Sequence, residues 1–150
     1  MNIDTIGKSP IPGNIPAGLD IRDTELFALL QAEYAKLTNP AATEPPDTSI
    51  IIANAVELLT NQGKDLMVAA YLANALMQQN GLAGLNQGLH IFGDMIETYW
   101  ESLYPGLNRL RGRRNSIQWL VDQTNKYLEV TTHEPQPVAL ISDSKAQVKR

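Results

Sequence analysis

The chain contains no cysteine and only two histidines, and these absences exclude several kinds of chemistry. Without cysteine it has no disulfides, no thiolate zinc site and no cysteine nucleophile. His90 and His133 lie far apart in the sequence, and neither belongs to a metal-binding motif such as HExxH. We therefore expect neither a metal nor another cofactor.

Long apolar runs are also missing. No segment approaches the roughly 20 apolar residues of a membrane-spanning helix. The first residues are polar and lead to Pro10 and Pro12, whereas a signal peptide needs an apolar core of about 7–15 residues. We therefore expect the chain to stay in the cytoplasm, without insertion into a membrane.

Positive charge is not in excess. Twelve Lys and Arg residues against sixteen Asp and Glu residues give a net charge of −4 and a pI of about 5.1. This balance argues against a dedicated nucleic-acid or anionic-membrane binder, whose affinity comes largely from neutralising phosphates. A length of 150 residues with 43% hydrophobic residues is typical of one globular domain.

Prolines and glycines are concentrated in residues 1–22, which hold Pro10, Pro12 and Pro16. Proline fixes φ and lacks a backbone donor, so this segment is predicted to be extended and irregular. Its isoleucines and leucine are more than a free tail needs, and we expect a strap that packs on the body at residues 23–130. Residues 131–150 have the composition of a linker toward an absent region.

The remaining pattern is helical. Helices are predicted from Asp23 or Thr24 to about residue 37, from Asp47 to Gly63, from Asp65 to Asn80, over 85–103 and over 115–128. The fourth has the clearest periodicity, because its apolar residues follow one another at spacings of four and three. Strand patterns and heptad repeats are absent. The predicted fold class is all-α, a bundle of about five amphipathic helices with an N-terminal strap.

A cluster of arginines is the one local anomaly in charge. Residues 1–100 hold four basic and eleven acidic side chains (4 − 11 = −7), whereas residues 101–150 hold eight and five (8 − 5 = +3). Aromatic residues lie next to this basic cluster, as they do in many interfaces. Salt bridging within the domain is the alternative role for the arginines. If the chain has a partner-binding surface, we expect it at Trp100, Tyr104, Arg109, Arg111, Arg113 and Arg114.

Two other functions stay open at this point. The arginine cluster at 109–114 is also compatible with an anion-binding or nucleic-acid-binding domain. Asp94, Glu97 and Glu101 lie on one predicted helical face, and with His90 they offer acids and bases for a small α-helical enzyme. Such charges more often form a solvated face. We expect no catalytic residues.

Several segments together resemble the ImpA N-terminal domain family. They are Ile-Pro-Gly at 11–13 with Pro-Ala-Gly-Leu-Asp at 16–20, Lys-Asp-Leu-Met-Val-Ala at 64–69, Gly-Leu-Ala-Gly-Leu at 81–85, Tyr-Trp-Glu-Ser-Leu-Tyr-Pro at 99–105, and Arg-Asn at 114–115. The resemblance covers about residues 10–128 in one order. The series as a whole is more specific than any single motif.

The resemblance implies a function in bacterial type VI secretion, as a component of the TssA (VasJ-like) group. Proteins of this group are cytoplasmic and non-enzymatic and assist assembly of the baseplate and the tail tube and sheath. The resemblance implies baseplate, sheath, tube or membrane-complex proteins as partners. It also implies that the full-length protein forms homo-oligomers through a C-terminal region missing here.

Overall fold

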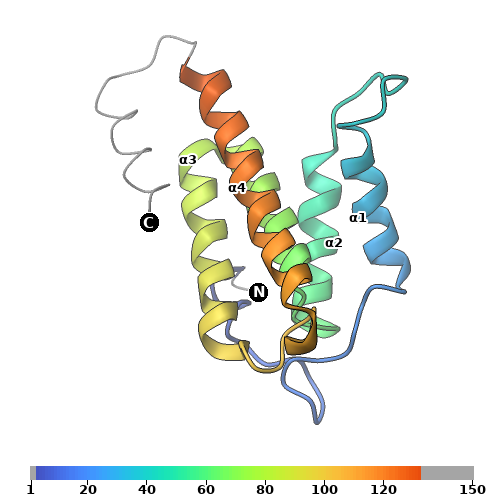
Figure 1. The fold of residues 1–150 in the computed structure, drawn as a ribbon, viewed down its shortest axis with the longest axis vertical. Coiled ribbons are helices and arrows are strands. Elements are labelled where there is room, and N and C mark those ends of the chain that lie inside the picture. The colour runs from blue at the N-terminus through green and yellow to red at the C-terminus, as the bar shows by residue number, and fades with distance from the viewer. Residues whose placement is uncertain (1–2, 133–150) are drawn as a thin grey trace.

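A computed structural model describes residues 3–132 of the chain (Figure 1). Over this range the structure is helical and contains no β-strand, which confirms the predicted all-α class. The elements in chain order are η1 (Ile3–Thr5), α1 (Glu25–Ala35), α2 (Thr48–Asn61), α3 (Leu66–Tyr99), η2 (Leu107–Arg109) and α4 (Leu110–Thr132). The expected linker at 131–150 lies outside the described residues apart from its first two, which end α4.

The starts of the first three helices follow the sequence prediction. Thr24, Asp47 and Asp65 are the N-caps of α1, α2 and α3, and each side chain accepts hydrogen bonds from backbone N–H groups of the first turn. Such bonds satisfy donors that have no partner within the helix. The caps therefore account for where these helices begin.

Helix α3 contains the expected third and fourth helices as two segments, 66–80 and 82–99. They meet at Gly81, whose φ of 65° and ψ of −143° are not helical. Glycine adopts this backbone conformation readily because it lacks a Cβ atom. Within the described range the structure therefore has four α-helices rather than about five, because two predicted helices form one bent element.

Small residues bring the two segments of α3 close together. A Cβ atom added at Gly88 would lie 2.5 Å from the Cα of Ala73, and one added at Gly84 would lie 1.9 Å from the carbonyl oxygen of Leu76. Neither glycine can carry a side chain at these distances. The two segments therefore form a tightly packed helical hairpin.

The hydrophobic core surrounds the first segment of α3. This segment is buried along almost its whole length and packs against α2 and α4, while α1 packs against α2 from the outside (Figure 1). Between these helices the ring of Tyr71 stacks on that of Tyr34, with centroids 4.5 Å apart. The ring of Trp119 from α4 meets both edge-on, with centroids 5.0 and 5.1 Å away. Trp119 thus belongs to the junction of α1, α3 and α4.

Helix α4 begins earlier than predicted, at Leu110 rather than near residue 115, and ends later, at Thr132 rather than near residue 128. The prediction took Asn115 as the start, but this residue lies well inside the helix. Three of the four arginines, Arg111, Arg113 and Arg114, are consequently part of α4, so their side chains point in different directions around this helix, whereas Arg109 ends η2.

The N-terminal strap packs on the helical body, in line with the predicted fold. Ile6, Ile11 and Ile21 are buried, whereas Ile15 and Leu19 are exposed. Backbone hydrogen bonds join the strap to the α2–α3 connection, from Lys64 N to the Ala17 oxygen (2.8 Å) and from Leu19 N to the Gln62 oxygen (2.9 Å).

A buried lysine also holds the strap. The ammonium of Lys64 donates hydrogen bonds to the carbonyl oxygens of Ile6 (2.6 Å) and Leu59 (2.7 Å) and lies 5.6 Å from the ring centroid of Tyr99. The side chain is fully buried, and among the residues that the structure describes no carboxylate pairs with it. Burial lowers the pKa of Lys64 to about 8, because removal from water disfavours the charged form.

This pKa predicts how stability depends on pH. The unfolded chain keeps the ordinary lysine pKa of about 10.4, so between pH 8 and pH 10 it binds a proton that the folded protein has lost. The free energy of unfolding should therefore rise by about 1–2 kcal/mol from pH 7.5 to pH 9.5. Urea denaturation followed by circular dichroism measures this rise. Lys64→Met should flatten it, and an equal rise in that variant would contradict the assignment.

Candidate functional site

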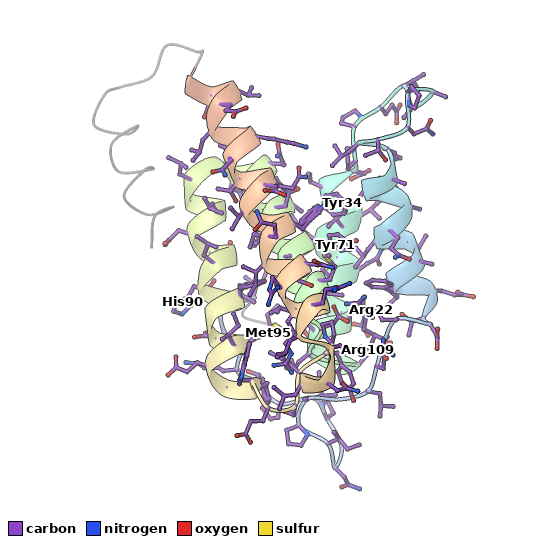
Figure 2. The ribbon with its side chains drawn as sticks, viewed as in Figure 1. Arg22, Tyr34, Tyr71, His90, Met95 and Arg109 are labelled. Atoms are coloured by element: carbon purple, nitrogen blue, oxygen red, sulfur yellow. The ribbon has the colours of Figure 1, made fainter. Side chains whose placement is uncertain are left out.

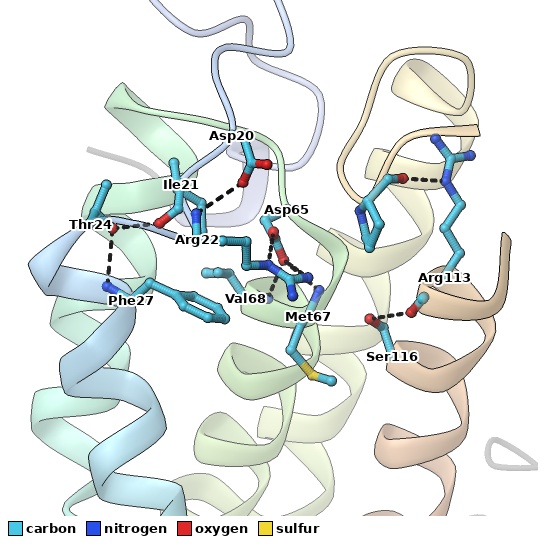
Figure 3. A network of polar contacts seen from close by, with 12 residues as sticks. Asp20, Ile21, Arg22, Thr24, Phe27, Asp65, Met67, Val68, Arg113 and Ser116 are labelled. Atoms are coloured by element: carbon cyan, nitrogen blue, oxygen red, sulfur yellow. Dashed lines mark hydrogen bonds and ion pairs between the residues drawn. The ribbon is translucent and has the colours of Figure 1, made fainter. Parts of the chain in front are cut away.

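An ion pair joins the end of the strap to the start of α3. The guanidinium of Arg22 contacts the carboxylate of Asp65 through Nε (2.7 Å to Oδ2) and Nη2 (3.2 Å to Oδ1) (Figure 3). Asp65 is fully buried, and Arg22 reaches it from the surface. The same carboxylate caps α3 by accepting from Met67 N (2.8 Å) and Val68 N (3.2 Å). Burial raises the pKa of Asp65, and Arg22 and the helix N–H groups oppose this shift.

The connection between α3 and α4 is hydrogen-bonded to the same region. Tyr104 N donates to the Lys64 oxygen (2.9 Å), and Leu66 N donates to the Tyr104 oxygen (2.7 Å). The hydroxyl of Tyr104 donates to the Gly18 oxygen of the strap (3.1 Å). Tyr104 is thereby held between the strap and the start of α3.

A groove with a volume of about 520 Å³ lies between these segments and the start of α4. Its charged lining residues are Arg22, Arg109, Arg111, Asp20 and Asp65, and Tyr104 also lines it. Figure 2 shows Arg22 and Arg109 close together at the lower end of the bundle. Asp65 is already paired with Arg22, which leaves Arg109, Arg111 and Asp20. The charged lining of the groove therefore has a net charge of +1 (3 − 2), carried by the arginines.

The structure brings three of the six predicted partner-binding residues together. Tyr104, Arg109 and Arg111 line the groove, and both arginines are exposed. Arg114 is exposed but lies outside the groove lining. Trp100 also lies outside it and is 40% exposed.

Arg113 is different, and its prediction as a surface residue is wrong. Only 1% of it is exposed. Its nitrogens donate to the backbone oxygens of Trp100 (2.5 Å), Leu103 (2.9 Å) and Pro105 (2.7 Å), and its guanidinium lies 4.5 Å from the ring centroid of Trp100. Burial lowers the pKa of Arg113. The residue fastens the α3–α4 connection to α4 and cannot meet a partner (Figure 3).

Sequence reasoning missed Arg22, Asp20 and Asp65 as parts of this groove. Asp65 was predicted as the start of a helix, and Asp20 and Asp65 lie in segments that carry the family resemblance, but neither was expected in a binding site. Arg22 and Asp65 are 43 residues apart, so helical periodicity carries no signal for their pairing. The groove depends on how the strap crosses the helices.

Of the residues considered for an enzyme, the structure pairs His90 with Asp94. Nε2 of His90 lies 3.5 Å from Oδ2 of Asp94, one helical turn away, and the imidazole is largely exposed. Glu97 and Glu101 are exposed. Within residues 3–132 no three His, Asp or Glu side chains are grouped closely enough to hold a metal ion. None of the helices in this range is long and apolar enough to cross a membrane.

Comparison with known protein families shows to which family the chain belongs. The family model "ImpA, N-terminal, type VI secretion system" matches residues 8–122. The chain belongs to this family. The ImpA N-terminal match spans most of the strap, the first three α-helices and about half of α4, and so includes every residue that lines the groove.

Two TssA proteins are similar to this ImpA N-terminal chain. The type VI secretion component TssA1 of Pseudomonas aeruginosa strain PAO1 is 37% identical over 65 residues, which are 43% of this chain and 19% of that protein. The solved N-terminal domain of TssA from Burkholderia cenocepacia, which includes the conserved ImpA N-terminal region, superposes with a TM-score of 0.73 at 25% identity. This match covers 85% of the present chain and half of that structure. The chain is thus TssA-like and corresponds to only part of each relative.

Proposed function

We propose that this domain is a non-enzymatic docking module of a type VI secretion system, which binds an acidic segment of another component during baseplate and tail tube or sheath assembly. The observation that carries the proposal is the groove in which Tyr104, Arg109 and Arg111 meet the strap. Exposed arginines pair with carboxylates in a planar, two-point geometry, and a tyrosine adds contact area with little loss of conformational entropy.

The relatives also support a proposal for where the module lies in the whole protein. We propose that residues 23–130, with the strap at 1–22, form the docking domain, and that residues 131–150 begin a connection to a further region. The chain spans half of the solved TssA structure, which supports this arrangement. Oligomerisation of the whole protein through that region would multiply weak contacts, since linked sites bind more tightly than single ones. We place the module in the cytoplasm, together with the tail proteins that it would bind.

Reversal of charge in the groove tests the docking proposal. Arg109→Glu combined with Arg111→Glu should reduce capture of type VI secretion proteins from a lysate of the encoding bacterium by about tenfold, because the groove would then repel acidic segments. Capture is measured by quantitative mass spectrometry at low and high salt. The wild-type signal should fall as salt rises, since exposed charges are screened.

Arg114→Glu is the matched control, because Arg114 is exposed on α4, the helix that carries Arg111, but lies outside the groove. This variant should retain capture close to that of the wild type. Circular dichroism confirms that all variants fold. Equal capture by the double variant and the wild type would reject the groove as the docking site. Salt-dependent binding of the wild type to generic duplex DNA, without capture of secretion proteins, would favour the anion-binding alternative.

A further inference from the structure

A second hollow lies in another part of the bundle and shares no lining residue with the groove. It has a volume of about 360 Å³ and is formed where the end of α1 and the loop after it meet α2, α3 and α4. Its walls include Tyr34, Leu37, Pro45, Pro46, Ile51 and Asn74. Figure 2 shows Tyr34 well above Arg22 and Arg109. We call this hollow the Asn74 pocket.

Asn74 lines this pocket, and one polar atom of its side chain has no partner among the described residues. The side chain is only 4% exposed, and among the described residues its Nδ2 atom forms no hydrogen bond. The other half of the amide meets the hydroxyl of Tyr34, which lies 3.0 Å from Oδ1 of Asn74 and 2.8 Å from the backbone oxygen of Tyr71.

Counting the available protons shows that one atom of the Asn74 amide stays without a hydrogen bond in either orientation of the amide. The hydroxyl of Tyr34 has a single proton, so it donates a hydrogen bond to only one of these two oxygens. If the amide is turned over, Nδ2 donates to the Tyr34 oxygen, Tyr34 donates to the Tyr71 oxygen, and Oδ1 becomes the atom without a partner. A buried polar group without a hydrogen bond is unfavourable, and native proteins contain few of them.

The rest of the lining limits the chemistry of a ligand. Leu37, Pro45, Pro46 and Ile51 are apolar, Gln78 and Gln123 add two further amides, and no charged side chain lines the pocket. An ionic ligand would lose water here without gaining a counter-charge. The volume falls within the range of small-ligand sites. An uncharged ligand with one apolar part and one hydrogen-bonding part fits this environment.

We propose that the Asn74 pocket binds an uncharged peptide segment of a partner protein, with one apolar side chain against Leu37, Pro45 and Pro46 and a peptide group on the Asn74 amide. A peptide group carries both an N–H donor and a C=O acceptor. It can therefore form a hydrogen bond with the unpartnered atom of the Asn74 amide in either orientation of that amide. This binding is distinct from the docking of an acidic segment in the groove, and either site can exist without the other.

The test is a nuclear magnetic resonance titration of the 15N-labelled 150-residue chain with N-acetyl-L-leucine methylamide. This compound, called the blocked leucine below, carries one apolar side chain between two peptide groups. We expect saturable shifts of the Asn74 side-chain amide and of the Tyr34 and Ile51 backbone signals, with half-saturation at about 1 mM. N-acetyl-L-leucine, which carries a carboxylate, and 3-methylbutan-1-ol, which lacks a peptide group, should each bind at least tenfold more weakly. Shifts that do not saturate, or that cluster elsewhere, would overturn the proposal. If 3-methylbutan-1-ol binds as tightly as the blocked leucine, the pocket is an apolar site that does not recognise a peptide group, and the proposal is rejected.

Two variants link the shifts to the pocket. Asn74→Leu removes the amide at similar volume and should weaken binding of the blocked leucine about tenfold. If that variant does not fold, Gln123→Trp fills the pocket from α4 and should abolish binding, whereas Gln118→Trp, at an exposed position of the same helix outside the pocket, should not. Unchanged affinity in Gln123→Trp would overturn the assignment. Affinity of the groove variants for the blocked leucine should stay at the wild-type value.

Discussion

Arg113→Ala should lower the free energy of unfolding by about 4 kcal/mol, one of the two largest effects expected in this domain. The variant leaves the backbone oxygens of Trp100, Leu103 and Pro105 without the guanidinium that satisfies them. Each buried polar group left without a partner costs about 1–3 kcal/mol, and removal of a large buried side chain adds a cavity. Since domains are stable by only about 5–15 kcal/mol, the variant should be close to unfolding at 37 °C.

Urea denaturation of matched variants measures this loss. Arg114→Ala, which truncates an exposed arginine at the next position, should change stability by less than about 0.5 kcal/mol. Arg113→Lys keeps the charge but lacks the fork of donors, so it should fall between the wild type and Arg113→Ala. Equal stability of Arg113→Ala and Arg114→Ala would show that the three oxygens find other partners.

Asp65→Ala should lower the free energy of unfolding by about 3 kcal/mol. It removes the N-cap of α3, typically worth about 1 kcal/mol, and leaves Arg22 without the carboxylate that it meets at 2.7 Å. Asp65→Asn keeps an amide oxygen that can cap the helix, so its loss should be about half as large.

A double-mutant cycle with Arg22→Met separates the cap from the ion pair. The coupling energy between Arg22 and Asp65 should be about 1–2 kcal/mol, and it should be absent between Arg22→Met and a variant of another cap, Asp47→Asn. A coupling energy of zero would show that Asp65 stabilises the fold as a helix cap alone. These measurements also bear on the groove, because Asp65→Asn would release the positive charge of Arg22 toward a ligand.

Much of the fold was predictable because its determinants are local in sequence. The caps at Thr24, Asp47 and Asp65 act on backbone groups two or three residues away, and Gly81 interrupts the helix at its own position. Apolar residues at helical spacing then identify the buried faces. These signals suffice for an all-α bundle with a strap.

The candidate site was less predictable because it depends on contacts between distant segments. Arg109, Arg111 and Arg113 cannot be distinguished by residue type. The position at which α4 begins determines which of their side chains is buried. The partners of Arg113 are backbone oxygens, which carry no signal in the side-chain sequence. The pairing of Arg22 with Asp65 likewise becomes visible only when the strap is placed on the body.

The close hairpin within α3 has a consequence for the order of folding. Ala73 and Gly88, which touch across it, are only fifteen residues apart, so closing this loop costs little conformational entropy. Contacts of the strap are far less local, because Tyr99 donates to the oxygen of Lys8 across 91 residues and Lys64 reaches Ile6 across 58. Since contacts near in sequence form faster than distant ones, we expect the hairpin to form first and the strap to dock late. On this expectation the groove, whose wall includes the strap, is completed only in the last stage of folding.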